Sequence, residues 1–489
     1  MKRVLDSPSP WHSTVGRGDF VESLLIALNW APTMVAPYNK NYFIMRMEMI
    51  IMSMGLNDKK DNKTLRRSFL KSSAATLSLA TLGASGLSSR VHAAGSGVIK
   101  IGLIGSGGRG SGAARDAMMV DEGVQLVAMA DVFEDRLQNK RKELKENLPD
   151  QVKVDNDHCF VGFDAYKKVI ASDVDVVLIA CASTFHPYYS KCAIEAGKHV
   201  FVEKPHGIDP PGIRMMKEVC DMAKKKKLCL VSGLMNRYVP EVRETINRIK
   251  DGAIGDIVAI EENYLRPPYV LVPRTAKDSE IEYHFRNWYH FSWLSGDDVP
   301  QSLVHNLDKA LWAMNEKTPV KAHGLAGRSA SFGDIYGDVF DHHTVVYEYD
   351  DGAKIYAFCR TQHNCHGGVS DIIQGTKGRC DLLKNRITGE TNWHYTGKTD
   401  SGYKVEHKEM LDAIRAGKYI VNDYMVNSTM AGILGQMACY SGKQLTWDQA
   451  YNSDFTFGPS EYSFDMKSPK LPSTYGNYPI AIPGRTKVI

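Results

Sequence analysis

Lys204 and His305 are the two side chains of this 489-residue chain whose surroundings best suit proton chemistry. Lys204 lies in Glu203-Lys204-Pro205, directly after the apolar run 200–202, so a strand formed by this run would present the lysine at a sheet edge. His305 lies in the run 304–308, and an imidazole readily accepts a proton near neutral pH. The alternative for His305 is a hydrogen-bonding role in the core of a helix.

A glycine-rich turn lies upstream, between a predicted strand over 98–104 and a predicted helix over 110–121. Glycines at this spacing allow a tight turn, close approach of the backbone to a pyrophosphate, and close helix packing. A strand–turn–helix without a nucleotide is the alternative. The order of turn, lysine and late histidine indicates a dehydrogenase acting on an alcohol. The residues expected to hold the cofactor in this turn are Gly105, Gly107, Gly108, Arg109 and Gly110.

Asp131 stands at the end of the second predicted strand, 125–130. An acidic side chain there accepts hydrogen bonds from the ribose hydroxyls of a dinucleotide and repels a 2′-phosphate. We therefore expect NAD as the cofactor and NADP less, a preference that Arg109 and Arg136 would weaken.

A second turn, 180–187, also follows a buried strand and opens a helix. The carboxyl edge of a doubly wound sheet is where ligands bind. Ser183, Thr184 and His186 are therefore candidates for contacts near the nicotinamide ribose. A helix N-cap role for Ser183 or Thr184 is the alternative.

The alternation of apolar runs with helical segments predicts the fold class. Continuous apolar strands separated by helices over 97–240 indicate a Rossmann domain, a doubly wound parallel sheet covered on both faces. Residues 241–456 have several strands with few helices between them, which predicts an α/β domain with a large open, mainly antiparallel sheet. Residues 457–489 are rich in Pro, Tyr and Ser and predict an extended C-terminal arm.

The first 93 residues predict export. Arg66-Arg67 precedes a weakly apolar run over 74–87, and Val91-His92-Ala93 offers a cleavage site after Ala93. This resembles a twin-arginine signal peptide over 54–93 and predicts a periplasmic protein that uses the twin-arginine export machinery. The run is too short and too polar for a stable membrane span. Residues 1–53 fit no part of such a peptide, so we interpret them as a non-native upstream extension.

Composition argues against a nucleic-acid partner. The chain has 60 Lys/Arg and 56 Asp/Glu, but the part after Ala93 has 48 basic and 50 acidic residues, so the excess of basic residues belongs to the leader. The nine cysteines are odd in number and lack zinc-ligand or redox spacing. We expect no disulfide framework. No metal is expected either, because the spacing of His363, Cys365 and His366 matches no standard site.

These motifs in this order resemble the glucose–fructose oxidoreductase / inositol dehydrogenase (Gfo/Idh/MocA) family over nearly the whole chain after the leader. The resemblance includes Asn236-Arg237-Tyr238 and implies oxidation of a secondary alcohol on a sugar, cyclitol or glycoside. It also implies that the open sheet mediates a homo-oligomer. Lys204 takes the role of contacting cofactor and substrate, Glu203 orients it, and His305 is the proton acceptor.

The resemblance also implies further substrate contacts, and one position departs from the family pattern. Arg237, Tyr238 and Asp308 are the expected contacts, with Asp308 on the helix face of His305. The family commonly has an acidic residue four positions before the histidine, where this chain has Gln301. An amide binds a sugar hydroxyl but cannot share a proton.

The sequence thus predicts an exported NAD-dependent oxidoreductase acting on a sugar or glycoside, with a tightly retained cofactor. Oxidation at C3 is one outcome, because a ketone at C3 acidifies the hydrogen on C2 and so prepares a glycoside for elimination. One alternative is an NAD-dependent glycosidase that uses transient oxidation. The second is a non-catalytic sugar-binding protein, against which the presence of both Lys204 and His305 argues.

Overall fold

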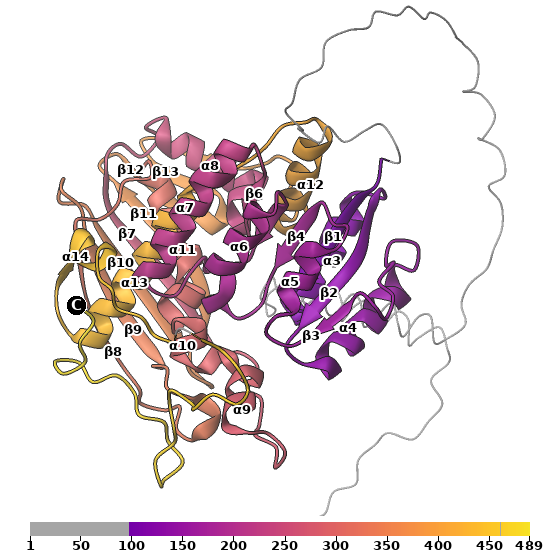
Figure 1. Ribbon diagram of the computed structural model, residues 1–489. Coiled ribbons are helices and arrows are strands. Elements are labelled where there is room, and N and C mark those ends of the chain that lie inside the picture. The colour runs from indigo at the N-terminus through magenta and orange to yellow at the C-terminus, as the bar shows by residue number, and fades with distance from the viewer. Residues whose placement is uncertain (1–96, 460) are drawn as a thin grey trace, which may run out of the picture. The chain divides into compact units, whose positions relative to one another are not determined.

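A six-stranded parallel sheet with the strand order β3-β2-β1-β4-β5-β6 forms the first domain of the computed structural model, which describes residues 97–459 and 461–489. Apart from the edge strand β3, its strands are almost entirely buried, because helices cover both faces of the sheet (Figure 1). The strands are β1 Ile99–Ile104, β2 Val124–Asp131, β3 Cys159–Val161, β4 Val176–Ile179, β5 His199–Val202 and β6 Leu230–Ser232. The helices are α3 Gly108–Val120, α4 Glu134–Asn147, α5 Ala165–Ala171, α6 His186–Glu195 and α7 Pro210–Lys226.

The strand order reverses beside β1, so the carboxyl ends of β1 and β4 form the switch point of a doubly wound sheet. The glycine-rich turn follows β1 and the turn 180–187 follows β4. Both predicted cofactor turns therefore lie at the edge where such sheets bind ligands.

A nine-stranded open sheet forms the second domain, with the order β14-β13-β12-β11-β7-β10-β9-β8-β15. Every pair is antiparallel except β7 with β10, which confirms the predicted mainly antiparallel sheet. The strands are β7 Ile257–Arg266, β8 Lys321–Gly327, β9 His342–Glu348, β10 Lys354–Thr361, β11 Gly368–Gly375, β12 Gly378–Asp381, β13 Arg386–Gly389, β14 Trp393–His394 and β15 Leu445–Thr446.

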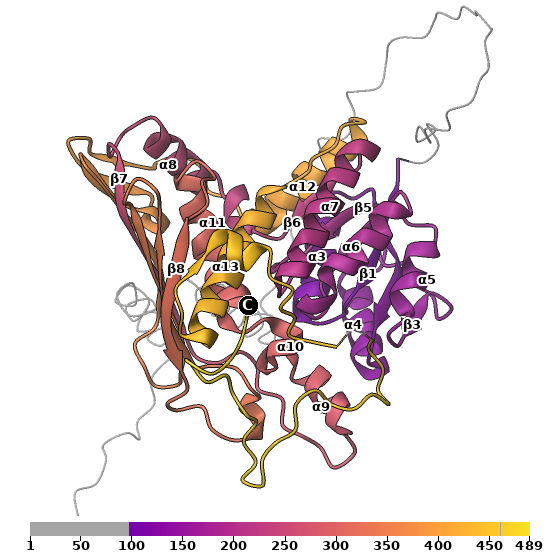
Figure 2. The same ribbon diagram turned by 60° about the vertical axis from the view of Figure 1, so that its left-hand side comes forward.

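Two helices, α11 Val304–Ala313 and α13 Tyr424–Ser441, pack against one face of this sheet (Figure 2). A short π-helical turn, Val299–Leu303, directly precedes α11. The predicted single helix over 299–314 is thus a π turn followed by an α-helix. Such turns occur often at functional sites. The other helices of this half are α8 Pro240–Lys250, α9 Glu280–Arg286, α10 Ser292–Ser295 and α14 Trp447–Tyr451.

Helix α12, Gly402–Arg415, returns from the second half of the sequence to the first domain, where it packs on α3. Its apolar side chains Met410, Leu411 and Ile414 belong to the core of the parallel sheet. Val421 then pairs with Leu230 of β6 in an isolated parallel bridge. A domain boundary near residue 240 therefore separates the two sheets, but α12 and Val421, which follow it in the sequence, pack on the first domain.

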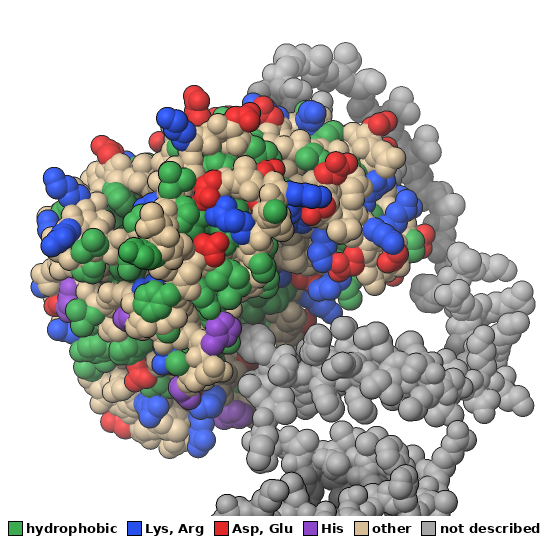
Figure 3. Space-filling view, turned by 90° about the horizontal axis from the view of Figure 1, so that it is seen from below, with side chains coloured by type: hydrophobic (Ala, Val, Ile, Leu, Met, Phe, Trp, Pro, Cys, Tyr) green, Lys and Arg blue, Asp and Glu red, His purple; other side chains and the backbone are tan. Residues whose placement is uncertain are grey.

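The described residues beyond 457 form no helix or strand and run along the surface. The predicted signal peptide and upstream extension lie outside the described residues. None of the helices in the described part of the chain is long and apolar enough to cross a membrane. On the face in Figure 3, acidic and basic side chains of the described residues are interspersed.

Candidate functional site

The glycine-rich turn has the local geometry needed to hold a pyrophosphate. Gly105 has a φ of +92°, and a Cβ there would lie 2.5 Å from the backbone nitrogen of Cys181. A Cβ on Gly110 would lie 1.9 Å from the Gly105 carbonyl oxygen, so both positions require glycine. Gly107 and Gly108 face open space instead, because a Cβ on either would meet no atom within 4 Å.

Helix α3 begins at Gly108 with no acidic residue in its first turn and no side chain capping its N-terminus. The positive end of the helix dipole and the free space beside Gly107 and Gly108 suit an anion. These features fit the diphosphate of a dinucleotide.

Asp131 lies beside this turn at the end of β2, where its carboxylate accepts hydrogen bonds from the backbone N–H groups of Ser106 (2.8 Å) and Phe133 (3.0 Å). Burial raises the pKa of Asp131, while the Arg136 charge and the backbone hydrogen bonds oppose that shift. The side chain thereby ties β2 to the glycine-rich turn and lines the cavity next to it.

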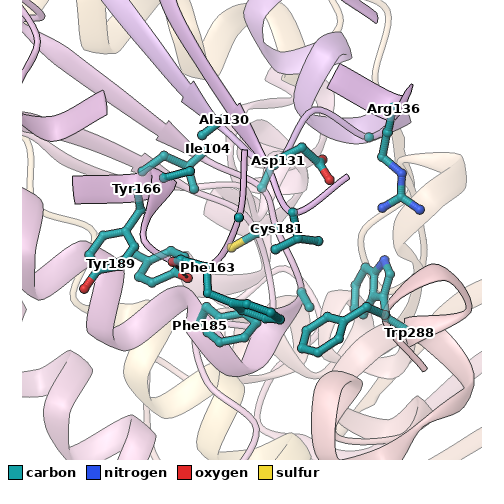
Figure 4. A pocket seen from close by; sticks show the side chains of 18 residues that line it. Ile104, Ala130, Asp131, Arg136, Phe163, Tyr166, Cys181, Phe185, Tyr189 and Trp288 are labelled. Carbon is teal, nitrogen blue, oxygen red and sulfur yellow. Dashed lines mark hydrogen bonds between the residues drawn. The ribbon is translucent and has the colours of Figure 1, made fainter. Parts of the chain in front are cut away.

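The cavity at the carboxyl ends of β1, β2 and β4 is largely aromatic (Figure 4). Trp288 and Phe285 come from the second domain and form part of the wall, whereas Tyr283 and His284 are core residues. Apolar faces around a few polar groups are typical of cofactor pockets. The lining comprises Ile104, Gly105, Gly107, Ala130, Asp131, Val132, Arg136, Gly162, Phe163, Ala165, Tyr166, Ala180, Cys181, Ala182, Phe185, Tyr189, Phe285 and Trp288.

Lys204, Gln301 and His305 come together, although Gln301 and His305 belong to the second domain. The Lys204 ammonium donates to the Gln301 carbonyl oxygen (2.7 Å), and its peptide bond to Pro205 is cis. The Gln301 side-chain oxygen accepts from the Ser183 hydroxyl (3.0 Å) at the end of β4. The π turn that carries Gln301 therefore contacts both predicted cofactor-side elements.

Two buried polar atoms of this cluster have no partner within the described residues: Gln301 Nε2 and His305 Nδ1. An unpaired buried polar atom is costly unless a ligand satisfies it. Burial lowers the pKa of His305 well below its ordinary 6.5, and the charges of Lys204 and Lys309 lower it further. The imidazole is therefore neutral at pH 7, as a proton acceptor must be.

Glu203 and Arg109 form a buried ion pair that joins the lysine turn to the glycine-rich turn. Arg109 Nε lies 2.9 Å from Glu203 Oε1, and the Lys204 N–H donates to Glu203 Oε2 (3.2 Å). Tyr403 of α12 covers the Arg109 guanidinium, 4.5 Å from its ring centroid. Arg109, expected to contact the cofactor, thus has its guanidinium engaged with Glu203 and α12.

The two hydroxyls of the β4 turn and its histidine have different surroundings. Ser183 contacts Gln301, and the Thr184 hydroxyl lies 3.1 Å from that of Tyr462. His186 is buried with its two ring nitrogens beside the carbonyl oxygens of Pro205 (2.7 Å) and Cys181 (3.1 Å). The structure therefore places His186 between the lysine turn and the β4 turn.

Arg237, Tyr238 and Asp308 form a separate buried network. Arg237 Nε donates to Asp308 Oδ1 (2.9 Å), Asp308 also accepts from Ser428 (2.7 Å), and the Tyr238 hydroxyl donates to Asn422 (2.7 Å). The hydrogen bonds of Asp308 thus connect α11 to its neighbours and not to the imidazole of His305. These three predicted substrate contacts are engaged within the protein.

Sequence reasoning missed the aromatic lining from Phe163, Tyr166 and Phe185 and the contribution of Tyr403. The aromatic residues sit in predicted helices or turns of the first domain, where such residues also signal ordinary core packing. Tyr403 is distant in sequence from the turn it covers, and no local pattern marks it.

Comparison with protein families gives two matches that follow the domain order. The model described as "Oxidoreductase family, NAD-binding Rossmann fold" matches residues 99–234. The model described as "Oxidoreductase family, C-terminal alpha/beta domain" matches residues 246–440, and both carry the Gfo/Idh/MocA name.

Curated relatives include inositol dehydrogenases and glycosyl hydrolases. The inositol 2-dehydrogenase of Acidothermus cellulolyticus is 27% identical over 47% of this chain and 57% of its own length. The myo-inositol 2-dehydrogenase of Thermotoga maritima is 27% identical over 58% of this chain and 74% of its own. The glycosyl hydrolase family 109 protein 1 of Bacteroides fragilis is 28% identical over 34% of this chain and 35% of its own. The match thus spans between about a third and three quarters of these relatives.

Solved structures share the fold. Levoglucosan dehydrogenase, in complex with NADH and levoglucosan, has a TM-score of 0.56 at 16% identity, covering 72% of this chain and 100% of its own. The myo-inositol 2-dehydrogenase of Lactobacillus plantarum has a TM-score of 0.55 at 20% identity, covering 71% and 99%. At these identities the likeness establishes the architecture alone.

Proposed function

Because this chain belongs to the Gfo/Idh/MocA oxidoreductase family, we propose that it oxidises a secondary hydroxyl of a sugar or glycoside with a bound nicotinamide cofactor. The observation that carries the proposal is the convergence of Lys204, Gln301 and His305, two of which leave a buried polar atom without a protein partner. NAD, when bound at the glycine-rich turn, supplies an acceptor for the hydride that leaves the substrate carbon.

Within this cluster His305 takes the hydroxyl proton, because its buried imidazole is neutral and its Nδ1 is unpaired. The Lys204 ammonium, held by the Gln301 carbonyl, stabilises negative charge that develops on the substrate oxygen. Gln301 Nε2 is a donor for a neighbouring hydroxyl. Its oxygen is already engaged by Ser183, so the amide orientation is fixed.

Identification of the bound nucleotide and of the sugar product tests this function. Mass spectrometry of the purified protein would reveal the retained nucleotide, and incubation with candidate glycosides would reveal a keto-sugar. A nicotinamide dinucleotide together with a product two mass units lighter than the substrate is expected. A protein that binds sugars without oxidising any of them would instead be the non-catalytic binding protein.

A second candidate is an NAD-dependent glycosidase that oxidises the substrate transiently. The similarity to glycosyl hydrolase family 109 proteins favours it, over about a third of each chain. Net oxidation remains the first proposal because this chain keeps Glu203-Lys204-Pro205. Release of the aglycone with no accumulated keto-sugar would favour the glycosidase.

The cofactor and its retention complete the proposal. Asp131 beside the glycine-rich turn favours NAD over NADP, because a carboxylate repels a 2′-phosphate. We further propose that the mature protein is periplasmic, where free dinucleotide is scarce, so that the cofactor stays bound and a second sugar regenerates it. Oxidation at C3 of a glycoside is the regiochemistry we propose, and NMR of the keto product would test it.

We also propose that the protein forms a homo-oligomer through the open sheet. Helices α11 and α13 cover one face of the sheet. On the other face Leu325 is 77% exposed and Tyr356 is 39% exposed. Exposed apolar side chains on a sheet face without helices are typical of association sites. Light scattering of the mature protein would detect a monomer if this proposal fails.

A further inference from the structure

The C-terminal arm beyond residue 457 lies outside both family matches, yet it packs against residues that line the cavity at the glycine-rich turn. In Figure 2 the yellow segment passes beside α10 and reaches the first domain next to α4. Side chains along 461–466 alternate between exposed and partly buried, with Tyr462, Phe464 and Met466 packed inward. One side of this segment therefore packs on the protein, and the other faces solvent.

Phe464 contacts aromatic rings of both domains. Its ring centroid lies 4.8 Å from that of Phe163 and 6.1 Å from that of Phe285, with edge-to-face geometry in both pairs. It also lies 5.7 Å from Phe133, the residue that precedes α4. Phe163 and Phe285 line the cavity, one from each domain. Phe163 and Phe285 also contact each other directly (5.0 Å), so Phe464 adds a third ring to this contact between the two domains.

Tyr462 makes a second bridge two residues earlier. Its hydroxyl lies 3.1 Å from that of Thr184 in the β4 turn. Its ring packs edge-on against Phe185 (4.7 Å), which lines the cavity, and stacks on Trp293 (6.0 Å) of the second domain.

The residues before and after the segment 461–466 are attached to the second domain. Upstream, Phe457 packs against Tyr440 of α13 with a centroid distance of 5.7 Å. Downstream, Tyr478 is buried and its hydroxyl accepts from Arg274 (2.8 Å). Near the end, the Gly484 N–H donates to the Ser441 carbonyl (2.8 Å). These three contacts are with the second domain, whereas Phe133, Phe163 and Thr184 belong to the first.

We propose that Tyr462 and Phe464 are positioning residues of the cofactor site, which hold the two domains closed over the dinucleotide and slow its release. The inference rests on the proposed function, since it requires that the aromatic cavity hold the nicotinamide dinucleotide. It adds a part of the chain beyond the two family domains to that site. It also offers a structural basis for the proposed retention of the cofactor in the periplasm.

The release rate of NADH from the full mature protein tests this role. The protein is loaded with NADH, excess NAD is added, and the loss of bound-NADH fluorescence is followed with time. Phe464→Ala removes the aromatic contacts with Phe163, Phe285 and Phe133, so release should become at least about tenfold faster. Phe464→Leu keeps apolar volume, so its release rate should lie between those of the wild type and Phe464→Ala. Tyr462→Phe removes only the Thr184 contact and should accelerate release less than Phe464→Ala.

Tyr475→Ala is the matched control, because Tyr475 belongs to the same arm but is 90% exposed. It should release NADH at the wild-type rate. A purely structural role of Phe464 would lower the melting temperature of Phe464→Ala and leave the release rate unchanged, which would overturn the proposal. Absence of NAD and NADP binding to the wild type would overturn the proposed function as well, so the two failures are distinguishable.

Discussion

His305 and Lys204 lie close enough for the lysine charge to influence the imidazole, although they come from different domains. Gln301 connects them, since its carbonyl oxygen accepts from Lys204 and its π turn leads directly into the helix of His305. In the proposed mechanism, proton transfer and charge stabilisation at one substrate oxygen therefore depend on a single local geometry.

Lys204→Met and His305→Asn should each lower kcat by about 10²–10⁴-fold, the usual contribution of a positioned acid or base. The double variant should be little slower than either single variant, because groups that act as a unit are non-additive. Steady-state kinetics with any sugar that the wild type oxidises would measure this. His305→Asn should still bind NAD, since the glycine-rich turn is intact. Near-normal turnover of either single variant would contradict the mechanism.

Asp131 has two roles. Its carboxylate accepts hydrogen bonds from the backbone N–H groups of Ser106 and Phe133, and its side chain also lines the cavity. Asp131→Ala should weaken NAD binding by about 1.5–3 kcal/mol, the range for a hydrogen bond to a charged group. NADP should lose less, since the change also removes repulsion of its 2′-phosphate.

Asp131→Asn is the control that separates these effects, because an amide oxygen still accepts from one backbone N–H. It should reduce the discrimination between NAD and NADP with less disturbance of the turn. Calorimetric titration of both dinucleotides measures the ratio of affinities. An unchanged ratio in both variants would show that Asp131 does not select the cofactor.

Helix α12 links distant parts of the sequence at the scale of secondary-structure elements. Tyr403 covers Arg109, and Glu406 is fully buried; burial raises the pKa of Glu406 well above 4.5, and the Glu203 charge raises it further. Next to it His407 packs against Phe201 of β5, with 4.4 Å between ring centroids. Both nitrogens of His407 are buried without a partner within the described residues.

His407 should make the protein sensitive to acid. Burial lowers its pKa to about 3, with a smaller effect from the Arg109 charge. Below pH 6.5 the unfolded chain binds a proton that the folded imidazole excludes, so stability falls as the pH falls from 6.5 toward 3. At pH 5 this costs about 2 kcal/mol. His407→Phe keeps the ring against Phe201 and should abolish that part of the loss.

Urea unfolding at pH 7.5 and pH 5 measures this difference for the wild type and the variant. His394→Phe serves as the control, since His394 is exposed on β14. An equal loss of stability in wild type and His407→Phe between the two pH values would refute the assignment.

We propose that the whole protein crosses the inner membrane in its folded state, because the twin-arginine route carries folded proteins with their cofactors. An Arg66→Lys/Arg67→Lys precursor should remain inside the cell, whereas the wild type should be cut after Ala93 and reach the periplasm. Cell fractionation with N-terminal sequencing measures both. Continued export of the double variant would refute the route.

The sequence by itself determined the order of elements and the chemistry available at their ends. Three local patterns mark the ends of strands whose apolar runs are continuous. They are the glycines at 105 and 110 after β1, Asp131 at the end of β2, and the Lys204 turn after β5. Strands β1 and β2 match the predicted runs 98–104 and 125–130 closely, because hydrophobic periodicity is encoded within a few residues.

Only the tertiary structure decided which of these groups meet. Arg109 faces Glu203 and Tyr403, Asp308 pairs with Arg237, and Gln301 reaches both Lys204 and Ser183. Each contact joins segments far apart in the chain, and its partner is set by how helices and sheets pack, which no local pattern encodes. The C-terminal arm is a further example. Its composition predicted an extended segment, but no local pattern indicated that Phe464 would contact both domains.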